Sequence, residues 1–365
     1  MQEIRIPVRP RPYSVRIGVG LLLRAGSELR RVFGRRPPRC FVLTVPPARR
    51  WARVVSTSLR RAKVEHAVLA IADGERAKVL SAVESLAERL VRAGADRDSI
   101  LLAVGGGVTG DVTGFLASIY MRGIDHVQLP TRFLAQVDAA IGGKTAVNLA
   151  AGKNLLGTFH QPRLVLADPE VLATLPERDY RAGLFEALKC GVIRDRRIFE
   201  FMERERERIL RRDPKALAWL IAACVRVKAA VVAADERERG LRRILNFGHT
   251  VGNALEAATG YRRLRHGEAV GWGMIAAADI GRAMGKTTAA TANRIERAVG
   301  AYGPLPRVHV SAEDVLRRLA ADKKTVDGVT HFVLPRRIGQ VEIVPDVPAR
   351  VVARAVERLR QGVRP

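Results

Sequence analysis

The sequence predicts an α/β domain with a parallel sheet, followed by a mostly α-helical domain. In the first half, short apolar runs alternate with amphipathic segments, as strands alternate with helices in parallel sheets. From Glu177 onward the segments are long and have helical spacing. Proline turns at 165–178 separate the two patterns. At 365 residues the chain is long enough for two domains, which we place at 1–170 and 171–365.

Four strands and one helix define the expected α/β domain. Apolar runs of strand length occupy Cys40–Leu43, His66–Ala70, Ile100–Val104 and Val127–Pro130. The segment 78–93 repeats apolar residues at helical spacing instead: Val79, Leu80, Val83, Leu86 and Leu90. Strands joined through helices pair in parallel, so we expect one doubly wound sheet.

The second half is expected to hold helices with one short strand. Helical spacing extends over 216–234 and 251–258. The segment 268–284 is rich in alanine, glycine and methionine with few charges, which is typical of a buried helix. A β-like run at 330–334 precedes a final helix at 349–359.

The composition favours a globular protein of the cytoplasm that does not associate with membranes. Hydrophobic residues make up 47% and charged residues 27%, as in ordinary soluble proteins. No run of eighteen apolar residues occurs, and Met1–Arg5 lacks the apolar core of a signal peptide. Three scattered cysteines, Cys40, Cys190 and Cys224, form neither a disulfide framework nor a zinc motif.

The net charge of +26 raises the question of nucleic-acid binding. Its 63 basic residues are 53 Arg and 10 Lys, spread along the whole chain. Aromatic residues are only 5%, and no basic stripe alternates with aromatic side chains that stack on bases. We therefore expect no nucleic-acid partner, and interpret the charge as a composition that attracts anionic small molecules.

Three glycine-rich loops lie within about fifty residues of one another. They are Gly105–Gly110, Gly142–Thr145 and Gly152–Asn154, and the last two carry Lys144 and Lys153. Glycine lets a backbone approach a ligand closely, and lysine adds a charge suited to phosphate. One such loop is an ordinary tight turn, but the three together indicate a site for a large, multiply anionic ligand.

The loop Gly105–Gly110 matches the GxGxxG pattern that holds a pyrophosphate at a helix N-terminus. Asp111 and Asp138 lie nearby along the chain and could bind hydroxyl groups. An earlier loop could hold ribose through Glu75 and phosphate through Lys78. The acidic residue expected about twenty positions after the glycines is not clearly present, so a standard dinucleotide fingerprint is incomplete.

A carboxylate and two histidines in the second half could bind a metal ion. Glu186, His249 and His266 are ligand types that suit zinc with one position open for substrate, although no HExxH motif is present. The other interpretation is an ion pair, since Glu186 and Lys189 are three residues apart on one helix face.

The order of these motifs resembles the 3-dehydroquinate synthase family of sugar-phosphate cyclases over roughly residues 65–340. The matching segments are Gly105–Val108 with Asp111, Tyr120–Gly123, Ala135–Asp138, Gly142–Thr145, Gly152–Asn154, Gly183–Lys189, Asp235–Arg237, Gly240–Arg242, Leu245–Thr250, His266–Val270 and Asp322–Lys324. Together these motifs are highly specific for the family.

The resemblance implies a Rossmann-like α/β domain that binds NAD and a helical domain that binds one divalent metal, Zn²⁺ or Co²⁺. It also implies the family's reaction, in which 3-deoxy-D-arabino-heptulosonate 7-phosphate becomes 3-dehydroquinate and phosphate in the shikimate pathway. The enzyme transiently oxidises an alcohol, eliminates phosphate, reduces the ketone and closes the ring. NAD is regenerated at each turnover. A homodimer is expected, because the family's pattern places Arg122 near the partner subunit's substrate.

By resemblance, the residues fall into three sets. The substrate set comprises Arg122, Lys144, Lys153, Asn154, Lys189, Lys228, Arg242, Asn246, Asn253 and Lys324. The cofactor set comprises Asp73, Glu75, Lys78, Gly105, Gly106, Gly107, Val108, Asp111, Thr131, Arg132, Asp138, Lys144, Lys153 and Thr174. The metal set comprises Glu186, His249 and His266.

The chain departs from the family pattern at three places. Asn253 replaces the second histidine of the GHTxGHA motif, and asparagine forms hydrogen bonds but cannot transfer a proton. Arg132 replaces the second residue of a threonine pair, and Thr44–Pro47 lacks the acidic residue expected after the strand that ends at Leu43.

Three other functions fit parts of this pattern. The nearest is another cyclase, of the 2-epi-5-epi-valiolone or 2-deoxy-scyllo-inosose synthase type, but Lys228, Arg242 and Asn246 match the dehydroquinate synthase pattern. A metal-dependent polyol dehydrogenase would not need the phosphate-binding lysines. A nucleic-acid-binding protein on an inactive enzyme scaffold would not need a nearly complete catalytic set.

Overall fold

The computed structural model describes residues 1–9, 11–321, 330–345 and 347–363. It divides into two compact units. The first comprises Met1–Leu175 together with Pro214–Glu236, and the second comprises Pro176–Asp213 together with Arg237–Pro365. This division differs from the expected boundary at 170/171, because Pro214–Glu236 returns to the first unit.

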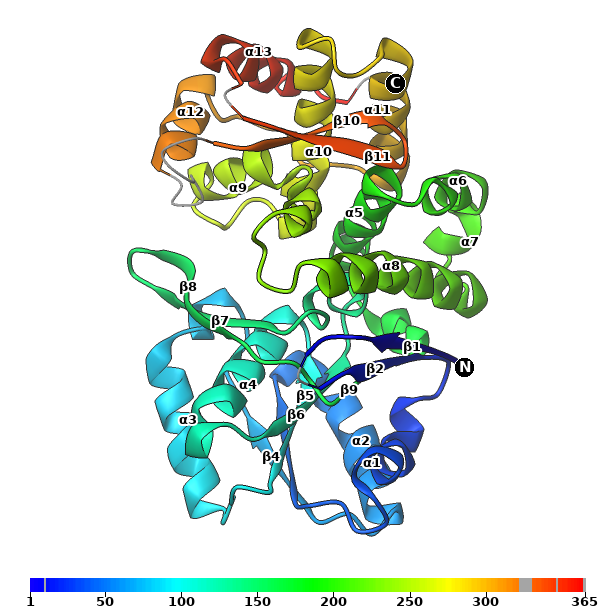
Figure 1. The fold of residues 1–365 in the computed structure, drawn as a ribbon, viewed down its shortest axis with the longest axis vertical. Helices are drawn as coiled ribbons and strands as arrows, with labels where there is room; N and C mark the ends of the chain where they lie inside the picture. The colour runs from blue at the N-terminus through cyan, green and yellow to red at the C-terminus, as the bar shows by residue number, and fades with distance from the viewer. Residues whose placement is uncertain (10, 322–329, 346, 364–365) are drawn as a thin grey trace. The chain divides into compact units, whose positions relative to one another are not determined.

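A seven-stranded sheet forms the centre of the first unit (Figure 1), in the order β1-β2-β9-β6-β5-β3-β4. Its strands are β1 (Gln2–Ile6), β2 (Tyr13–Ile17), β3 (Cys40–Thr44), β4 (His66–Ala70), β5 (Ile100–Gly105), β6 (Asp125–Pro130) and β9 (Leu164–Ala167). All neighbours pair in parallel except β1 with β2. The parallel α/β sheet is therefore confirmed, whereas the antiparallel pair at its edge was not predicted.

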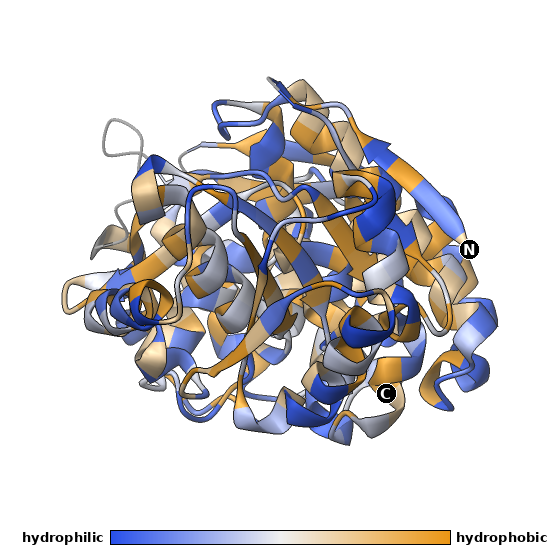
Figure 2. Ribbon diagram, turned by 90° about the horizontal axis from the view of Figure 1, so that it is seen from below, coloured by the Kyte–Doolittle hydropathy of each residue, from blue (hydrophilic) through white to orange (hydrophobic). Residues whose placement is uncertain are grey.

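Helices α1 (Ala25–Phe33), α2 (Arg49–Arg61), α3 (Leu80–Arg92) and α4 (Gly107–Ile119) cover the sheet. Side chains of α3 and α4 form a buried apolar cluster with β3 and β5; its members include Phe41, Leu43, Leu101, Leu86, Phe115 and Leu116. Burial of such side chains stabilises the fold by about 2 kcal/mol each. Colouring by hydropathy shows that β1, beside the N-terminus, contains both polar and apolar residues (Figure 2).

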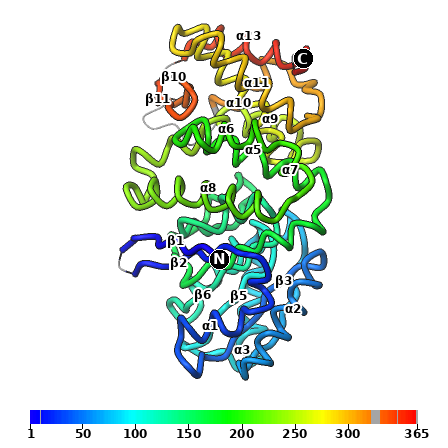
Figure 3. The backbone as a smooth tube through the Cα atoms, turned by 90° about the vertical axis from the view of Figure 1, so that its right-hand side faces the viewer, coloured from blue at the N-terminus to red at the C-terminus, as the bar shows by residue number. Residues whose placement is uncertain are grey.

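The helix α8 (Pro214–Ala234) packs against β1 and β2 of the first unit (Figure 3). Within the described residues it is the one helix long and apolar enough to cross a membrane, and most of it is buried inside the protein. A core helix of a globular protein has the same properties. Its apolar face covers the edge pair, which explains why this segment belongs to the first unit.

Two further strands, β7 (Lys144–Leu149) and β8 (Gly152–Phe159), form a separate antiparallel hairpin in the first unit. Short helical segments connect the larger elements: η1 (Leu22–Arg24), η2 (Pro46–Ala48), η3 (Glu75–Ala77), η4 (Tyr120–Arg122), η5 (Ala135–Ala139), η6 (Pro169–Thr174) and, in the second unit, η7 (Leu241–Asn246).

The second unit is mostly helical, as predicted. Its helices are α5 (Glu177–Ile193), α6 (Arg196–Arg204), α7 (Arg206–Leu210), α9 (His249–Ala258), α10 (His266–Ala283), α11 (Ala289–Tyr302), α12 (Ala312–Ala321) and α13 (Ala349–Leu359). One hairpin, β10 (Phe332–Arg337) and β11 (Gln340–Val344), completes it. The buried helix α10 contacts α5, α9, α11 and α13, so it is the centre of this unit.

His126 in β6 is expected to make the first unit sensitive to acid. Its ring is 1% exposed and stacks on His160 at 5.1 Å. Burial, with a smaller contribution from His160, lowers the pKa of His126 to about 3. An unfolded histidine titrates near ~6.5, so between about pH 6.5 and pH 3 only the unfolded chain binds this proton. The free energy of unfolding therefore falls as pH decreases through this window, by up to ~1.4 kcal/mol per pH unit.

Urea unfolding at successive pH values measures this dependence. The variant His126→Phe should have a shallower slope between pH 6.5 and pH 4 than the native chain, because it has no proton to bind at this position. His309→Ala, at an exposed histidine, should keep the native slope. Parallel curves for His126→Phe and the native chain would show that another group causes the acid sensitivity.

Candidate active site

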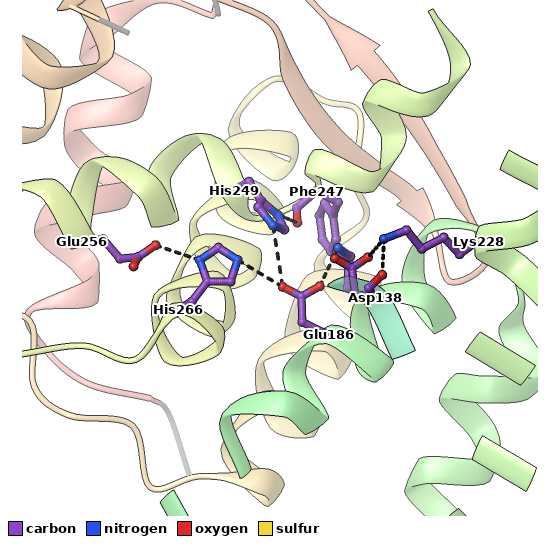
Figure 4. Close-up of polar contacts among 8 residues, drawn as sticks. Asp138, Glu186, Lys228, Phe247, His249, Glu256 and His266 are labelled. Atoms are coloured by element: carbon purple, nitrogen blue, oxygen red, sulfur yellow. Dashed lines mark hydrogen bonds and ion pairs between the residues drawn. The ribbon is translucent and has the colours of Figure 1, made fainter. Parts of the chain in front are cut away.

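Glu186, His249 and His266 come together in the second unit (Figure 4). Their ligand atoms all lie within 4.8 Å of one another, which is close enough for one metal ion to bind all three. The two Nε2 atoms face the same carboxylate oxygen of Glu186, at 3.6 Å for His249 and 3.5 Å for His266. Two histidines and a carboxylate with space for substrate are typical of a catalytic zinc site.

The three side chains come from three different helices. Glu186 lies in the middle of α5, and His266 is the first residue of α10. His249 begins α9, directly after Gly248, whose left-handed φ of +79° suits glycine. Gly252 and Gly273 let α9 and α10 approach closely, since a Cβ at either position would meet backbone of the other helix. Close helix packing therefore sets the distance between the two histidines.

Both histidine rings are oriented by a second contact (Figure 4). Nδ1 of His266 lies 2.8 Å from Oε2 of Glu256, and Nδ1 of His249 lies 3.2 Å from the carbonyl oxygen of Phe247. Such contacts leave Nε2 of each ring directed at Glu186 and make the ring a stronger ligand. Glu256 was not predicted. A signal existed, because Glu256 follows His249 by seven residues and so shares its helix face.

The charge balance keeps Glu186 ionised. Nζ of Lys189 lies 2.5 Å from Oε2 of Glu186, so the predicted ion pair forms at the same carboxylate that lies beside the two histidines. Burial opposes ionisation, but Lys189 and the two histidines hold the pKa of Glu186 well below its usual range. For His266, burial also opposes the charged form, but hydrogen bonds to Glu186 and Glu256 raise its pKa to about 10.

The glycine loop of the first unit has the geometry expected of an anion site. Gly105 ends β5, and α4 begins at Gly107 with no side-chain cap on its N-terminal N–H groups. Free N–H groups at a helix N-terminus attract anions. Arg132 packs over the loop, since a Cβ at Gly106 would lie 2.7 Å from its Cδ atom. Arg132, which replaces the second residue of the threonine pair, thus places its guanidinium group next to the glycines.

Two groups of predicted residues meet in the first unit. Lys78 is 3% exposed, and its Nζ lies 2.5 Å from Oδ2 of Asp111 and also donates to Oδ1 of Asn154. Burial raises the pKa of Asp111, and Lys78 opposes this shift. Separately, Nζ of Lys228 donates to the carbonyl oxygen of Asp138 at 2.5 Å and to its Oδ1 at 2.7 Å. The structure thus joins residues of the expected cofactor set to residues of the expected substrate set.

The other predicted residues have varied surroundings. In the second unit, Arg242 is buried and Nδ2 of Asn246 donates to Oε1 of Glu238 at 3.0 Å. Asn253 shares the helix face of His249 and Glu256, at spacings of four and three residues.

In the first unit, Asp73, Arg122, Lys144 and Thr174 are exposed, while Glu75, Lys153, Val108 and Thr131 are at least partly buried. Lys324 lies outside the described residues.

Comparison with known proteins identifies the family. Residues 68–182 match the family model for the 3-dehydroquinate synthase N-terminal region, and residues 183–325 match the model for its C-terminal region. The chain belongs to the 3-dehydroquinate synthase family. A 3-dehydroquinate synthase of Koribacter versatilis is 54% identical over 361 residues, which cover 99% of this chain and 98% of that protein.

Solved structures of related cyclases share the fold. A 2-deoxy-scyllo-inosose synthase bound to carbaglucose-6-phosphate, NAD⁺ and Co²⁺ has a TM-score of 0.87 at 26% identity, covering 99% of this chain and 100% of its own. The 2-epi-5-epi-valiolone synthase of Streptomyces hygroscopicus with NAD⁺ and Zn²⁺ also has a TM-score of 0.87, at 29% identity, covering 97% and 98%. The chain is more similar in sequence to the Koribacter 3-dehydroquinate synthase than to either of these cyclases.

Proposed function

We propose that this protein converts 3-deoxy-D-arabino-heptulosonate 7-phosphate to 3-dehydroquinate and phosphate, with catalytic NAD and one divalent cation. The observation that carries the proposal is the cluster of Glu186, His249 and His266 in a chain of the 3-dehydroquinate synthase family. We also propose a cytoplasmic homodimer that acts in the shikimate pathway and has no nucleic-acid or membrane partner.

The residues present fit both cofactors. Oε1 of Glu186 is buried and lies 3.6 Å and 3.5 Å from Nε2 of His249 and His266, so one cation could bind all three side chains. The uncapped N-terminus of α4 behind the glycine loop suits a dinucleotide phosphate. When bound, NAD would accept and return one hydride, and the cation would polarise the hydroxyl group that loses it.

The chain's own residues would bind and orient the substrate. Buried cations suit an anionic substrate, because charge interactions strengthen away from water. Lys189, Lys228 and Arg242 are the buried cations of the proposed substrate set. Arg242 offers a planar fork to a carboxylate or phosphate, and the lysines add point charges. Since asparagine at 253 cannot transfer a proton, proton movement would depend on the substrate's own phosphate.

Incubation of the purified protein with the heptulosonate phosphate, NAD and Zn²⁺ tests the proposal. Phosphate and dehydroquinate should appear in equal amounts, and no NADH should accumulate because the hydride returns to the same molecule. NADH that rises in proportion to product would indicate a dehydrogenase. Product from sedoheptulose 7-phosphate or glucose 6-phosphate instead would indicate one of the other cyclases, the alternative that Asn253 favours.

The variant Asn253→His is expected to change turnover only modestly, by about tenfold or less. Asn253 lies on the same face of α9 as His249 but has no titration near neutrality, so it adds no acid–base limb to the native rate profile. Histidine at 253 would adjust one hydrogen bond to substrate. Rates measured across pH check this, and a thousandfold gain would mean that the native chain lacks a proton-transfer group for this substrate.

A further inference from the structure

Asn148 of β7 connects two groups of residues that the proposed function assigns to different ligands. Its Oδ1 accepts the backbone N–H of Asn154 at 2.9 Å. Its Nδ2 donates to Oε1 of Glu75 at 2.8 Å. Its own backbone N–H donates to the carbonyl oxygen of Lys78 at 2.7 Å. One partly buried side chain thus bonds to the loop that carries Glu75 and Lys78 and to the hairpin that carries Asn154.

The hairpin needs this contact because its strand pairing is interrupted there. Val147 pairs with Leu156, but Leu149 pairs with Gly152, so residues 153–155 of β8 bulge opposite Asn148. Asn154 has a left-handed φ of +56° within the bulge. A bulge removes strand-to-strand hydrogen bonds, and the side chain of Asn148 replaces one of them. Asn148 therefore holds the segment with Lys153 and Asn154 in place at the projecting tip of the hairpin (Figure 1).

The contacts form a closed circuit around Lys78. The backbone of Lys78 accepts from Asn148, Nζ of Lys78 donates to Asn154, and the N–H of Asn154 donates back to Asn148. Asp111 joins the circuit through Nζ of Lys78, at 2.5 Å. In such a circuit, movement of any one member stretches the hydrogen bonds of the others.

We propose that Asn148 is a positioning residue that couples binding of the dinucleotide to binding of the substrate phosphate. The inference rests on the proposed function, in which Glu75 and Lys78 contact the dinucleotide while Lys153 and Asn154 contact the phosphate. A ligand that fixes one side of Asn148 also orders the other side, so the second ligand binds a segment that is already in place. Coupling of this kind is reciprocal: each ligand raises the affinity of the other by the same factor.

The chemistry of position 148 suggests a specific variant. An amide can accept from Asn154 and donate to Glu75 at the same time. In Asn148→Asp the carboxylate still accepts from Asn154, but it cannot donate to Glu75 and repels it. The double variant Asn148→Asp with Glu75→Gln reverses the direction of that one hydrogen bond, since the amide at 75 then donates to the carboxylate at 148.

The affinity for NAD is measured by calorimetry with and without a carbocyclic phosphonate analogue of the heptulosonate phosphate. In the native protein the analogue should raise the affinity for NAD by about tenfold, a usual size for coupled sites. In Asn148→Asp this factor should fall to about one, and in the double variant it should return to at least half the native value on a logarithmic scale. Asn293→Asp, at an exposed position of α11, should keep the native factor.

Several outcomes would overturn the inference. The first is that the analogue does not change the NAD affinity of the native protein. The second is that the analogue still raises the NAD affinity of Asn148→Asp by the native factor. If that factor is unchanged while the NAD affinity of Asn148→Asp is lower, Asn148 has a structural role only. A double variant that behaves like Asn148→Asp would overturn the assigned hydrogen bond to Glu75. A native protein that binds both ligands but makes no dehydroquinate would overturn the proposed function alone, because the binding cycle does not depend on turnover.

Discussion

Replacement of His249 by alanine is expected to remove the bound divalent cation and to lower turnover by about a thousandfold or more. The variant leaves one carboxylate and one histidine, too few to hold zinc in a catalytic site. The ion pair between Glu186 and Lys189 cannot replace the lost histidine as a metal ligand, because this ion pair already forms in the native site. Metal analysis after chelator treatment and reconstitution with Zn²⁺ measures the loss of metal, and the dehydroquinate assay measures the loss of turnover.

Two further variants make this test specific. His309→Ala removes an exposed histidine of the same unit and should keep one equivalent of metal. Glu256→Gln keeps all three ligands but removes the carboxylate that orients His266, so the metal affinity should fall by about 10–100-fold. If His249→Ala still binds one equivalent of metal and turns over at the native rate, the assigned ligand set is wrong.

The ligand set illustrates how far the sequence predicts the site. Glu186, His249 and His266 are up to 80 residues apart in the chain, and spacing alone left the metal site and the Glu186–Lys189 ion pair as alternatives. The resemblance to the family selected the metal set, and in the structure these three side chains lie together while Glu186 also pairs with Lys189. Glu256 could have been predicted from its spacing on α9, whereas the Phe247 carbonyl could not, because a backbone atom leaves no sequence signal.

Lys228 lies in a helix whose domain could not be predicted from the sequence pattern. A domain boundary predicted from a change in apolar spacing divides the chain at one point. The sequence therefore places α8 in the helical second domain with its neighbours. The helix instead packs on β1 and β2, which places Lys228 beside Asp138 in the first unit. The pair β1 and β2 also escaped prediction, although Ile4 and Ile6 alternate with charged residues as in an edge strand. Only the fold shows that the edge strands and the helix cover each other.

The contacts of Asn148 could not be predicted from the sequence either. Its role depends on a local interruption of the β7–β8 pairing, and the hydrophobic pattern and turn that set the register of a hairpin do not indicate which side chain replaces a lost strand hydrogen bond. From sequence, Asn148 is one polar residue between the glycine-rich loops Gly142–Thr145 and Gly152–Asn154. Motifs such as Gly152–Asn154 predict that a segment contacts a ligand, but they do not indicate which neighbour holds that segment in place.

Gly273→Ala is expected to destabilise the second unit by more than about 3 kcal/mol and to weaken metal binding. A Cβ at 273 would lie 1.8 Å from the carbonyl oxygen of Gly248 and 2.9 Å from the amide nitrogen of Gly252. These are backbone atoms of α9 and its N-terminus, so no side-chain rotation relieves the clash. The gain of ~1 kcal/mol in helix propensity from glycine to alanine is smaller than this cost.

The clash at Gly273 also reaches the metal ligands, because Gly248 directly precedes His249 and the two helices carry His249 and His266. If α9 and α10 move apart, the histidines separate and the cluster loses its geometry. Gly271→Ala in the same helix is the matched control, since its nearest neighbours are ring atoms of Phe185 at 3.3 Å, which can shift. Urea unfolding and zinc stoichiometry compare the two variants. Equal stability and full zinc binding in both would show that close packing at Gly273 does not set the distance between the two histidines.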